Sequence, residues 1–214
     1  MVQMTTNSDT LFAQLNIPPP FDTVDPESRD RELEALSRDL IQKSRLDYFN
    51  TMCPREFCSP IDRTLLRNLN AWDEANKWTP GEYPGIWLWS PETGLGKTRM
   101  LWKKVGQAVV SGKRYIFITG IHLGEWYYEC FRDGEPLKFY GRFRNHDVVM
   151  LDDLDKYPVD DERAARALRE LWDNFYRNHV SVIVSANEPP EFMQERIGHS
   201  AYRRIMEVCQ PIQF

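Results

Sequence analysis

The stretch that decides the fold is WLWSPETGLGKTRM, residues 87–100. It closes with glycine, lysine and threonine, as does the phosphate-binding formula G-x-x-x-x-G-K-[ST], but Pro91 stands where that formula has its first glycine. Gly94 and Gly96 would let backbone N–H groups turn toward phosphate oxygens. Pro91 removes one N–H donor at the point where the chain leaves the preceding strand. The stretch therefore predicts a nucleotide site, and the alternative is a chance match in a turn.

Each side chain of this loop has an expected role. Lys97 would reach the β- and γ-phosphates of ATP, and the hydroxyl of Thr98 would bind Mg²⁺. A helix that begins at Lys97 would add partial positive charge. The residues expected to bind the nucleotide are Thr93, Gly94, Leu95, Gly96, Lys97, Thr98 and Arg99.

The sequence around this loop alternates between strands and helices. Strands are expected at 85–90, 114–120, 147–153 and 180–187, with a last, truncated strand at 211–214. Helices are expected at 97–111, 122–131, 160–179, 190–197 and 200–209. This alternation predicts the α/β class, with a parallel sheet of about five strands flanked by helices. Ligands of such sheets bind at the carboxyl ends of the strands.

Two aspartates follow the apolar run of the expected strand DVVMLDD, residues 147–153. A nucleotide-hydrolysing site needs one carboxylate near Mg²⁺ and a second group that positions water. We assign Asp152 to Mg²⁺ and Asp153 to activation of the water. The alternative is a surface acidic turn, since further aspartates follow at 155, 160 and 161.

A polar residue ends the next expected strand, VSVIVSAN. Asn187 could hydrogen-bond the attacking water or the γ-phosphate. Its alternative role is to start the turn before residues 188–190, because asparagine readily hydrogen-bonds its own backbone in turns.

The composition is that of a globular protein without a global basic field. The chain has 214 residues, a formal charge of −5 and a pI of about 5.5. Its four cysteines are scattered and lack the ligand set of a structural zinc site, which fits a reducing compartment. No apolar run is long enough for a membrane span and no secretion signal is evident, so we expect a cytoplasmic protein.

The N-terminal region differs in character from the rest. Residues 1–25 are expected to form a loose arm, and a helix follows, with Asp25 as its cap and Leu33, Leu36 and Leu40 in a narrow apolar stripe. The stripe either packs on the chain's own domain or docks a partner. A boundary near residue 50 divides the chain into 1–50 and a core of 51–214. Another helix is expected at 63–78.

With these elements in order, the chain resembles the AAA+ ATPases of the P-loop class. It looks most like the helicase-loader and transposition-helper group of the DnaC/IstB type, which includes phage and prophage ATP-binding proteins. The segments that carry the resemblance are CPREF, GLGKTR, VVMLDDLD, VSAN and AYRRIMEVC, which fall between residues 53 and 209. The P-loop alone would not be specific for AAA+ ATPases, but these segments in this order are.

The resemblance implies roles that the residue pattern alone does not give. Lys97 and Thr98 correspond to the Walker A pair, and Asn187 to sensor 1. Asp152 and Asp153 correspond, in the same way, to the Walker B pair. Arg204, with Arg203 as the alternative, falls where this group has an arginine that enters a neighbour's ATP site, which implies homo-oligomers on ATP binding. The competing interpretation of both arginines is solvated helix charge.

Two further expectations follow from the resemblance. The sequence ends at Phe214, after the fifth expected strand, so we expect no C-terminal helical lid and an ATPase that is slow or partner-dependent. By analogy with loaders, residues 26–46 are the candidate region for docking a replicative helicase.

The stretch LKFYGRFRNHD, residues 137–147, interleaves cations with aromatic rings. Such interleaving could bind single-stranded DNA, with cations on phosphates and rings under bases. Equally, the stretch could pack its rings inward as an amphipathic loop.

The sequence therefore predicts an ATP- and Mg²⁺-binding ATPase that assists DNA replication, foremost as a helicase loader. The alternatives are a transposition-helper ATPase and a nucleotide-dependent interaction module that does not hydrolyse ATP.

Overall fold

The structure is a computed structural model that describes residues 26–59 and 62–214, without the side chains of 26–30 and 32. The expected loose arm at 1–25 and the expected cap Asp25 lie outside the described residues. The chain divides into two compact units, residues 1–44 and 45–214, and each is described by itself.

The described elements alternate between helices and strands along the larger unit. The strands are β1 Gly85–Trp89, β2 Tyr115–Thr119, β3 Val148–Asp152, β4 Ser181–Ala186 and β5 Cys209–Gln213. The α-helices are α2 Pro26–Met52, α3 Arg55–Cys58, α4 Leu69–Lys77, α5 Lys97–Val110, α6 Gly120–Arg132, α7 Pro136–Gly141, α8 Glu162–Arg177, α9 Pro190–Ile197 and α10 His199–Val208. Two 3-10 turns complete them, η2 Arg63–Leu65 and η3 Leu154–Lys156.

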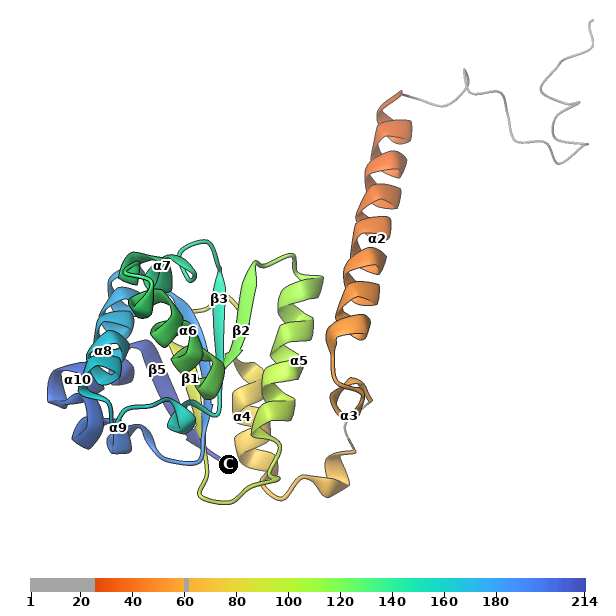
Figure 1. Cartoon of the computed structure of the whole chain (residues 1–214). Coiled ribbons are helices and arrows are strands. Elements are labelled where there is room, and N and C mark those ends of the chain that lie inside the picture. The colour runs from red at the N-terminus through yellow and green to blue at the C-terminus, as the bar shows by residue number, and fades with distance from the viewer. Residues whose placement is uncertain (1–25, 60–61) are drawn as a thin grey trace, which may run out of the picture. The chain divides into compact units, whose positions relative to one another are not determined.

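The five strands form one parallel sheet in the order β2-β3-β4-β1-β5 (Figure 1). Leu151 of β3 is in register with Val184 of β4, and Trp89 of β1 is in register with Ala186 of β4. Because all three strands run the same way, the loops after β1, β3 and β4 leave from one edge of the sheet. The expected α/β sheet of five strands is confirmed.

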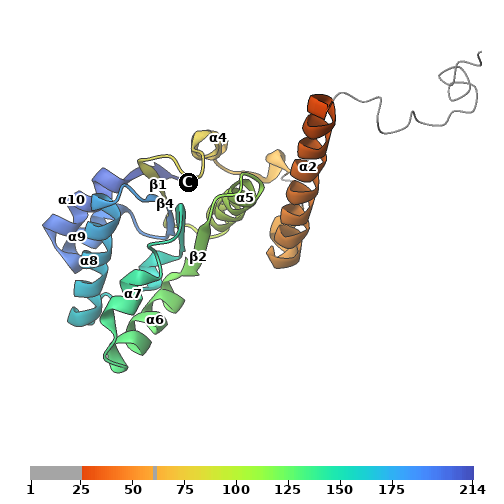
Figure 2. The ribbon, with the colours of Figure 1, turned by 90° about the horizontal axis from the view of Figure 1, so that it is seen from above.

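Helices cover both faces of the sheet (Figures 1 and 2). One face packs on α4 and α5 through Ile86, Leu88 and Met150 of the strands. The other face packs on α6 to α10, with Trp87 of β1 next to Trp172 of α8, their rings tilted by 31°. Neighbouring strand residues face opposite sides, so strands covered on both faces have runs of apolar residues instead of an alternating pattern, as in Val148–Leu151 of β3.

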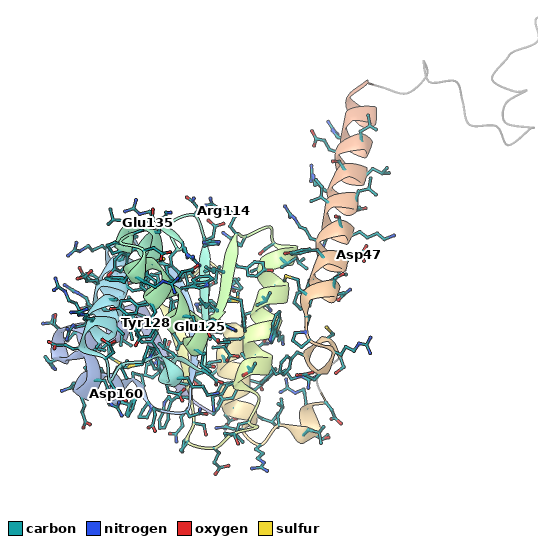
Figure 3. The ribbon with its side chains drawn as sticks, in the orientation of Figure 1. Asp47, Arg114, Glu125, Tyr128, Glu135 and Asp160 are labelled. Carbon is teal, nitrogen blue, oxygen red and sulfur yellow. The ribbon has the colours of Figure 1, made fainter. Side chains whose placement is uncertain are left out.

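Hydrogen bonds fix both edges of the sheet. Asn68 caps α4 by accepting from Ala71 N–H at 3.1 Å, and its side-chain amide donates to the carbonyl of Gln213 in β5 at 3.2 Å. At the other edge, Arg114 donates to the carboxylate of Asp147 from its backbone N–H at 2.8 Å and from its guanidinium at 2.9 Å. Arg114, labelled in Figure 3, thereby holds the entry of β2 beside the entry of β3.

The structure corrects one expected helix. The helix expected at 63–78 is a 3-10 turn at Arg63–Leu65, a break at 66–68 and a helix from Leu69 to Lys77. The break arises because the side chain of Asn68 serves as an N-cap, a role that asparagine fills better than a place inside a helix.

In the smaller unit, α2 carries the expected apolar stripe. Leu33, Leu36 and Leu40 are all more than half exposed. The helix runs on to Met52, through the boundary expected near residue 50, and the division into 1–50 and 51–214 stays a prediction. Within the described part of the chain, every helix is too short or too polar to cross a membrane.

Candidate functional site

The glycine-bearing loop lies between the carboxyl end of β1 and the start of α5. Gly94 and Gly96 have φ angles of 75° and 98°, a backbone region that other residues enter at a cost. A Cβ on Gly94 would meet nothing within 4 Å, whereas a Cβ on Gly96 would lie 3.4 Å from the ring of Trp72. Pro91 is exposed at the start of the loop. The loop thus has the backbone form and the free space that a phosphate group needs.

Lys97 is the first residue of α5 and is buried beneath this loop. Its ammonium donates to the carbonyls of Ser90 at 3.2 Å and Glu92 at 3.1 Å. Burial lowers the pKa of Lys97, and the nearby carboxylates Asp153, Asp155 and Asp152 oppose that shift. A buried ammonium held only by carbonyls would gain from a phosphate anion in the loop.

Thr98, Asp152 and Ser185 form a chain of hydrogen bonds from α5 across two strands. The hydroxyl of Thr98 donates to Asp152 Oδ1 at 3.1 Å, and the hydroxyl of Ser185 donates to the same oxygen. Burial raises the pKa of Asp152, while the hydrogen bonds from Ser185 and Thr98 lower it. The structure thus brings together Thr98 and Asp152, the two residues expected to bind Mg²⁺, and that role stays a prediction.

Asp153 has a left-handed backbone, with φ at 50°, which is uncommon for any residue but glycine. Its N–H donates to the hydroxyl of Ser185 at 2.9 Å, and its carboxylate accepts from the ammonium of Lys156 at 2.5 Å. Asn187 donates to the carboxylate of Asp155 from its backbone at 3.0 Å and from its amide at 3.1 Å. Strained residues held by their neighbours are typical of functional sites.

Several of these residues line one cleft of about 470 Å³, namely Lys97, Thr98, Asp153, Lys156 and Asn187. One wall is the loop and helix start, residues 93–99, and the opposite wall holds Asp153, Lys156 and Asn187. The rest of the lining is mostly apolar and comes from Phe57, Leu65 and Leu66, together with the charged residue Asp62. All seven residues expected to bind the nucleotide line this cleft, and the structure brings two of the three expected catalytic residues to it.

Arg99 differs from the other loop residues because it contacts a segment before the core. Its guanidinium donates to the carbonyl of Ser59 at 3.0 Å and to the Ser59 hydroxyl at 2.9 Å. Its Nε is buried without a hydrogen-bond partner among the described residues. Arg99 therefore holds residues 57–59 against the cleft and keeps one donor available there.

Arg204 lies on α10 and is held inside its own chain. Its guanidinium pairs with Glu207 at 2.9 Å and Asp173 at 3.4 Å, and it lies 4.0 Å from the centre of the Tyr176 ring. Arg203 is more exposed and has a looser pair with Glu207 at 3.7 Å. The part of either arginine in a neighbour's site stays a prediction.

The basic and aromatic stretch at 137–147 packs its rings inward. Phe139 and Phe143 are buried in the core against Phe175 of α8, and the hydroxyl of Tyr140 donates to Glu170 at 2.6 Å. Lys138 pairs with Glu135. The structure thus supports the packing interpretation, and the interpretation in which these rings stack on bases is wrong for Phe139 and Phe143.

Sequence reasoning missed two members of the site. Ser185 was noted only as part of a strand end, and Lys156 was not considered. The register of β3 and β4 pairs Leu151 with Val184, so the residue after each, Asp152 and Ser185, must lie side by side. Pairing the ends of the expected strands would have found Ser185.

Most of the site lies within the part of the chain that a protein-family model matches. A model described as the bacterial DnaA ATPase domain matches residues 68–203, more than half of the chain. The chain belongs to the bacterial DnaA ATPase domain family. It is 26% identical over 134 residues to the chromosomal replication initiator protein DnaA of Campylobacter jejuni. The matched segment covers 60% of this chain and 30% of the initiator. The matched part of this DnaA-type chain is thus about 30% of the length of that relative.

Two solved structures share the fold of this DnaA-type domain. In the crystal structure of the DnaC helicase loader, the aligned sequence is 18% identical to this chain and the TM-score is 0.61. The alignment covers 75% of this chain and 99% of that chain. The replication initiator DnaA bound to AMPPCP and single-stranded DNA is also 18% identical, with a TM-score of 0.56 and coverage of 67% and 44%. Both are AAA+ P-loop domains, so the chain has the AAA+ fold. The expected resemblance to AAA+ ATPases is confirmed at this level; the phage-type group stays a prediction.

Proposed function

We propose that this DnaA-type protein binds ATP in the cleft beside the loop at 91–96. The observation that carries the proposal is the loop itself, where Gly94 has open space around it and the buried ammonium of Lys97 lies against the carbonyls of Ser90 and Glu92. The phosphates would lie against the N–H groups of the loop and the start of α5. The base and ribose would lie toward the apolar lining at Leu65 and Leu66. The related DnaA structure with AMPPCP supports the same class of ligand.

The residues present also fit Mg²⁺. The hydroxyl of Thr98 and the carboxylate of Asp152 lie 3.1 Å apart, and hard oxygen donors of this kind are what Mg²⁺ prefers. Bound there, Mg²⁺ would neutralise charge on the phosphates. Ser185 would keep the Asp152 carboxylate turned toward Thr98.

We further propose that the cleft hydrolyses ATP. Asp153 would accept a proton from the attacking water, and Asn187 would hydrogen-bond that water or the γ-phosphate. Both residues line the cleft opposite the loop, on the side where the terminal phosphate would lie.

Steady-state ATPase assays with and without single-stranded DNA test this proposal. We expect turnover by the wild type, loss of at least about tenfold in Lys97→Ala, and no change in the control Lys113→Ala, which removes an exposed lysine after α5. If the wild type binds ATP but turns over no faster than Lys97→Ala, the protein is a non-hydrolysing interaction module instead.

At the level of biology, we propose a role in DNA replication as a helicase loader. The DnaC helicase loader supports this because nearly all of that chain aligns with this one. The exposed stripe of Leu33, Leu36 and Leu40 on α2 is the proposed docking surface for a replicative helicase.

A pull-down against the host's replicative helicase tests the loader role. We expect capture by the full chain and loss of capture when residues 1–46 are deleted, with the ATPase activity of the deleted form as the check on its fold. Substituting the three leucines of the stripe by serine in the full chain should have the same effect. Failure of capture, together with capture of a transposase, would favour the transposition-helper alternative.

A further inference from the structure

Lys156 is the one cation in the cleft wall opposite the loop among the described residues. It lies at the end of the 3-10 turn η3, directly after β3, and its ammonium contacts the Asp153 carboxylate at 2.5 Å. In a 3-10 turn, side chains three residues apart lie one above the other, so the pair follows from the local backbone. The nucleotide proposal gives Lys156 no role.

The surroundings of Lys156 are strongly acidic. Hydrogen bonding to Asp153 raises the pKa of Lys156, and the charges of Asp153, Asp155 and Asp152 act in the same direction. The charge of Lys156 in turn acts on Asp152, the proposed Mg²⁺ carboxylate. Lys156 is therefore a permanent cation within electrostatic reach of the place where the terminal phosphate would lie.

The contact opposes the proposed reaction, because the Lys156 ammonium occupies an oxygen of the Asp153 carboxylate that would otherwise face the attacking water. A γ-phosphate would bring more negative charge into the cleft than the single carboxylate that holds Lys156 now, and half of the lysine side chain is exposed and able to turn.

We propose that Lys156 is a γ-phosphate-binding residue that rests on Asp153 in the absence of ATP. When ATP binds, the ammonium moves from the carboxylate to the terminal phosphate, and the Asp153 carboxylate becomes free to face the attacking water. The residue thereby makes the cleft favour ATP over ADP, which lacks that phosphate. The inference rests on the proposed ATP-binding function.

Calorimetric titration with the non-hydrolysable analogue AMPPCP and with ADP, both with Mg²⁺, tests this assignment. We expect Lys156→Gln to weaken AMPPCP binding about tenfold and ADP binding less than about twofold. Lys156→Arg, which keeps the charge, should retain most of the preference. The matched control is Lys138→Gln, because Lys138 of α7 pairs at the same spacing of three residues with Glu135, which is labelled in Figure 3.

The resting contact is tested separately in an Asp153→Asn background. There the ammonium has no carboxylate to leave, so Lys156→Gln should weaken AMPPCP binding more than it does with Asp153 present. An equal loss for AMPPCP and ADP, or no loss for either, would overturn the proposal while leaving ATP binding intact. A wild type that binds neither nucleotide would instead overturn the proposed function.

Discussion

At the scale of the residue, Gly94 and Gly134 have the same backbone conformation in different surroundings. Their φ angles are 75° and 72°, and a Cβ on either would meet nothing within 4 Å. Alanine at either position should cost about 1 kcal/mol of folding free energy, since each forces a left-handed backbone on a residue with a side chain. Only Gly94 lines the cleft, so only Gly94→Ala should weaken nucleotide binding, by about tenfold.

Thermal unfolding and nucleotide titration of both variants check this prediction. Equal losses of stability with a binding defect in Gly94→Ala alone are the expected pattern. A binding defect of similar size in Gly134→Ala would mean that the defect comes from lost stability and not from the space filled at Gly94.

A second comparison separates the role of Ser185 from its burial. Ser185 and Ser181 are both buried on β4, but Ser181 accepts from Gly81 N–H at 3.0 Å at the other end of the strand. Both alanine variants should lose about 1–2 kcal/mol of stability, because each removes the partner of a hydrogen bond. Ser185→Ala alone should lower ATPase turnover, by about tenfold, because it removes the hydrogen bonds that orient the Asp152 carboxylate and the Asp153 backbone.

The readouts are denaturant unfolding and steady-state turnover at saturating ATP. Similar turnover in the two variants would show that the hydroxyl of Ser185 serves only the fold. The pair is informative because the two serines share strand and burial and differ in what they hold.

The predicted and the missed residues differ in how they are encoded. Lys97, Thr98 and Asp152 were predicted because each lies in a contiguous motif whose chemistry restricts the residue type. Ser185 acts across a strand pair, and Lys156 acts through a turn whose hydrogen bonding depends on where β3 ends. Such contacts become visible only once the strand register is known.

At the scale of the element, α4 and α5 are joined by a buried lysine. Lys104 of α5 is fully buried and donates to the carbonyls of Asn76, at 3.0 Å, and Trp78 at the end of α4. Burial lowers its pKa from 10.5 to about 8, with the neighbouring Lys103 adding to the shift. The contact places a cation on the carbonyls that close α4, where the helix dipole favours it.

This lysine predicts a dependence of stability on pH. Between about 8 and 10.5 the unfolded chain holds more protons on Lys104 than the folded chain does, so stability should rise as pH rises through that range. Relative to Lys104→Met, the wild type should gain about 2 kcal/mol of unfolding free energy between pH 7 and pH 10. Urea unfolding at several pH values measures it, and parallel curves for the two proteins would contradict it.

The strands were predicted well, including β2, which is only half-buried. The four strands expected between 85 and 187 match the structure to within one residue at each end, because each is an apolar run bounded by polar residues or turns. The helix expected at 63–78 was wrong because Asn68 competes with the helix for its own backbone N–H groups. Propensity summed over the stretch could not show that competition.

At the scale of the whole molecule, the sequence leads to the family but not to its partners. The ATPase domain is recognisable because motif, strand and helix recur in a fixed order. A partner is recognised by a surface, and the stripe on α2 has a chemistry, three exposed leucines among charges, that many partners would satisfy. Assembly with further copies likewise depends on how two surfaces fit each other. The sequence of a single chain does not show which two surfaces meet.

Arg204 carries the prediction that decides whether copies complete each other's sites. If it enters a neighbour's cleft, it must leave Glu207, Asp173 and the ring of Tyr176 when the assembly forms. Arg204→Ala and Lys97→Ala should then each be nearly inactive as ATPases. A 1:1 mixture should recover about a quarter of wild-type activity, because half of the subunits keep an intact loop and half of their neighbours keep the arginine.

The mixture must be assayed at protein concentrations where sizing with AMPPCP shows assemblies, and Arg203→Ala mixed in the same way tests the alternative arginine. Two results together identify Arg204 as the residue that enters the neighbour's cleft. ATPase activity recovers when Arg204→Ala is mixed with Lys97→Ala, and Arg203→Ala by itself is as active as the wild type. A mixture as inactive as its components, with Arg204→Ala folded by its melting curve, would mean that the arginine only joins α10 to α8 within its own chain, as its contacts with Asp173 and Tyr176 already do. Each cleft would then have to work with the cations of its own subunit, Lys97, Arg99 and Lys156.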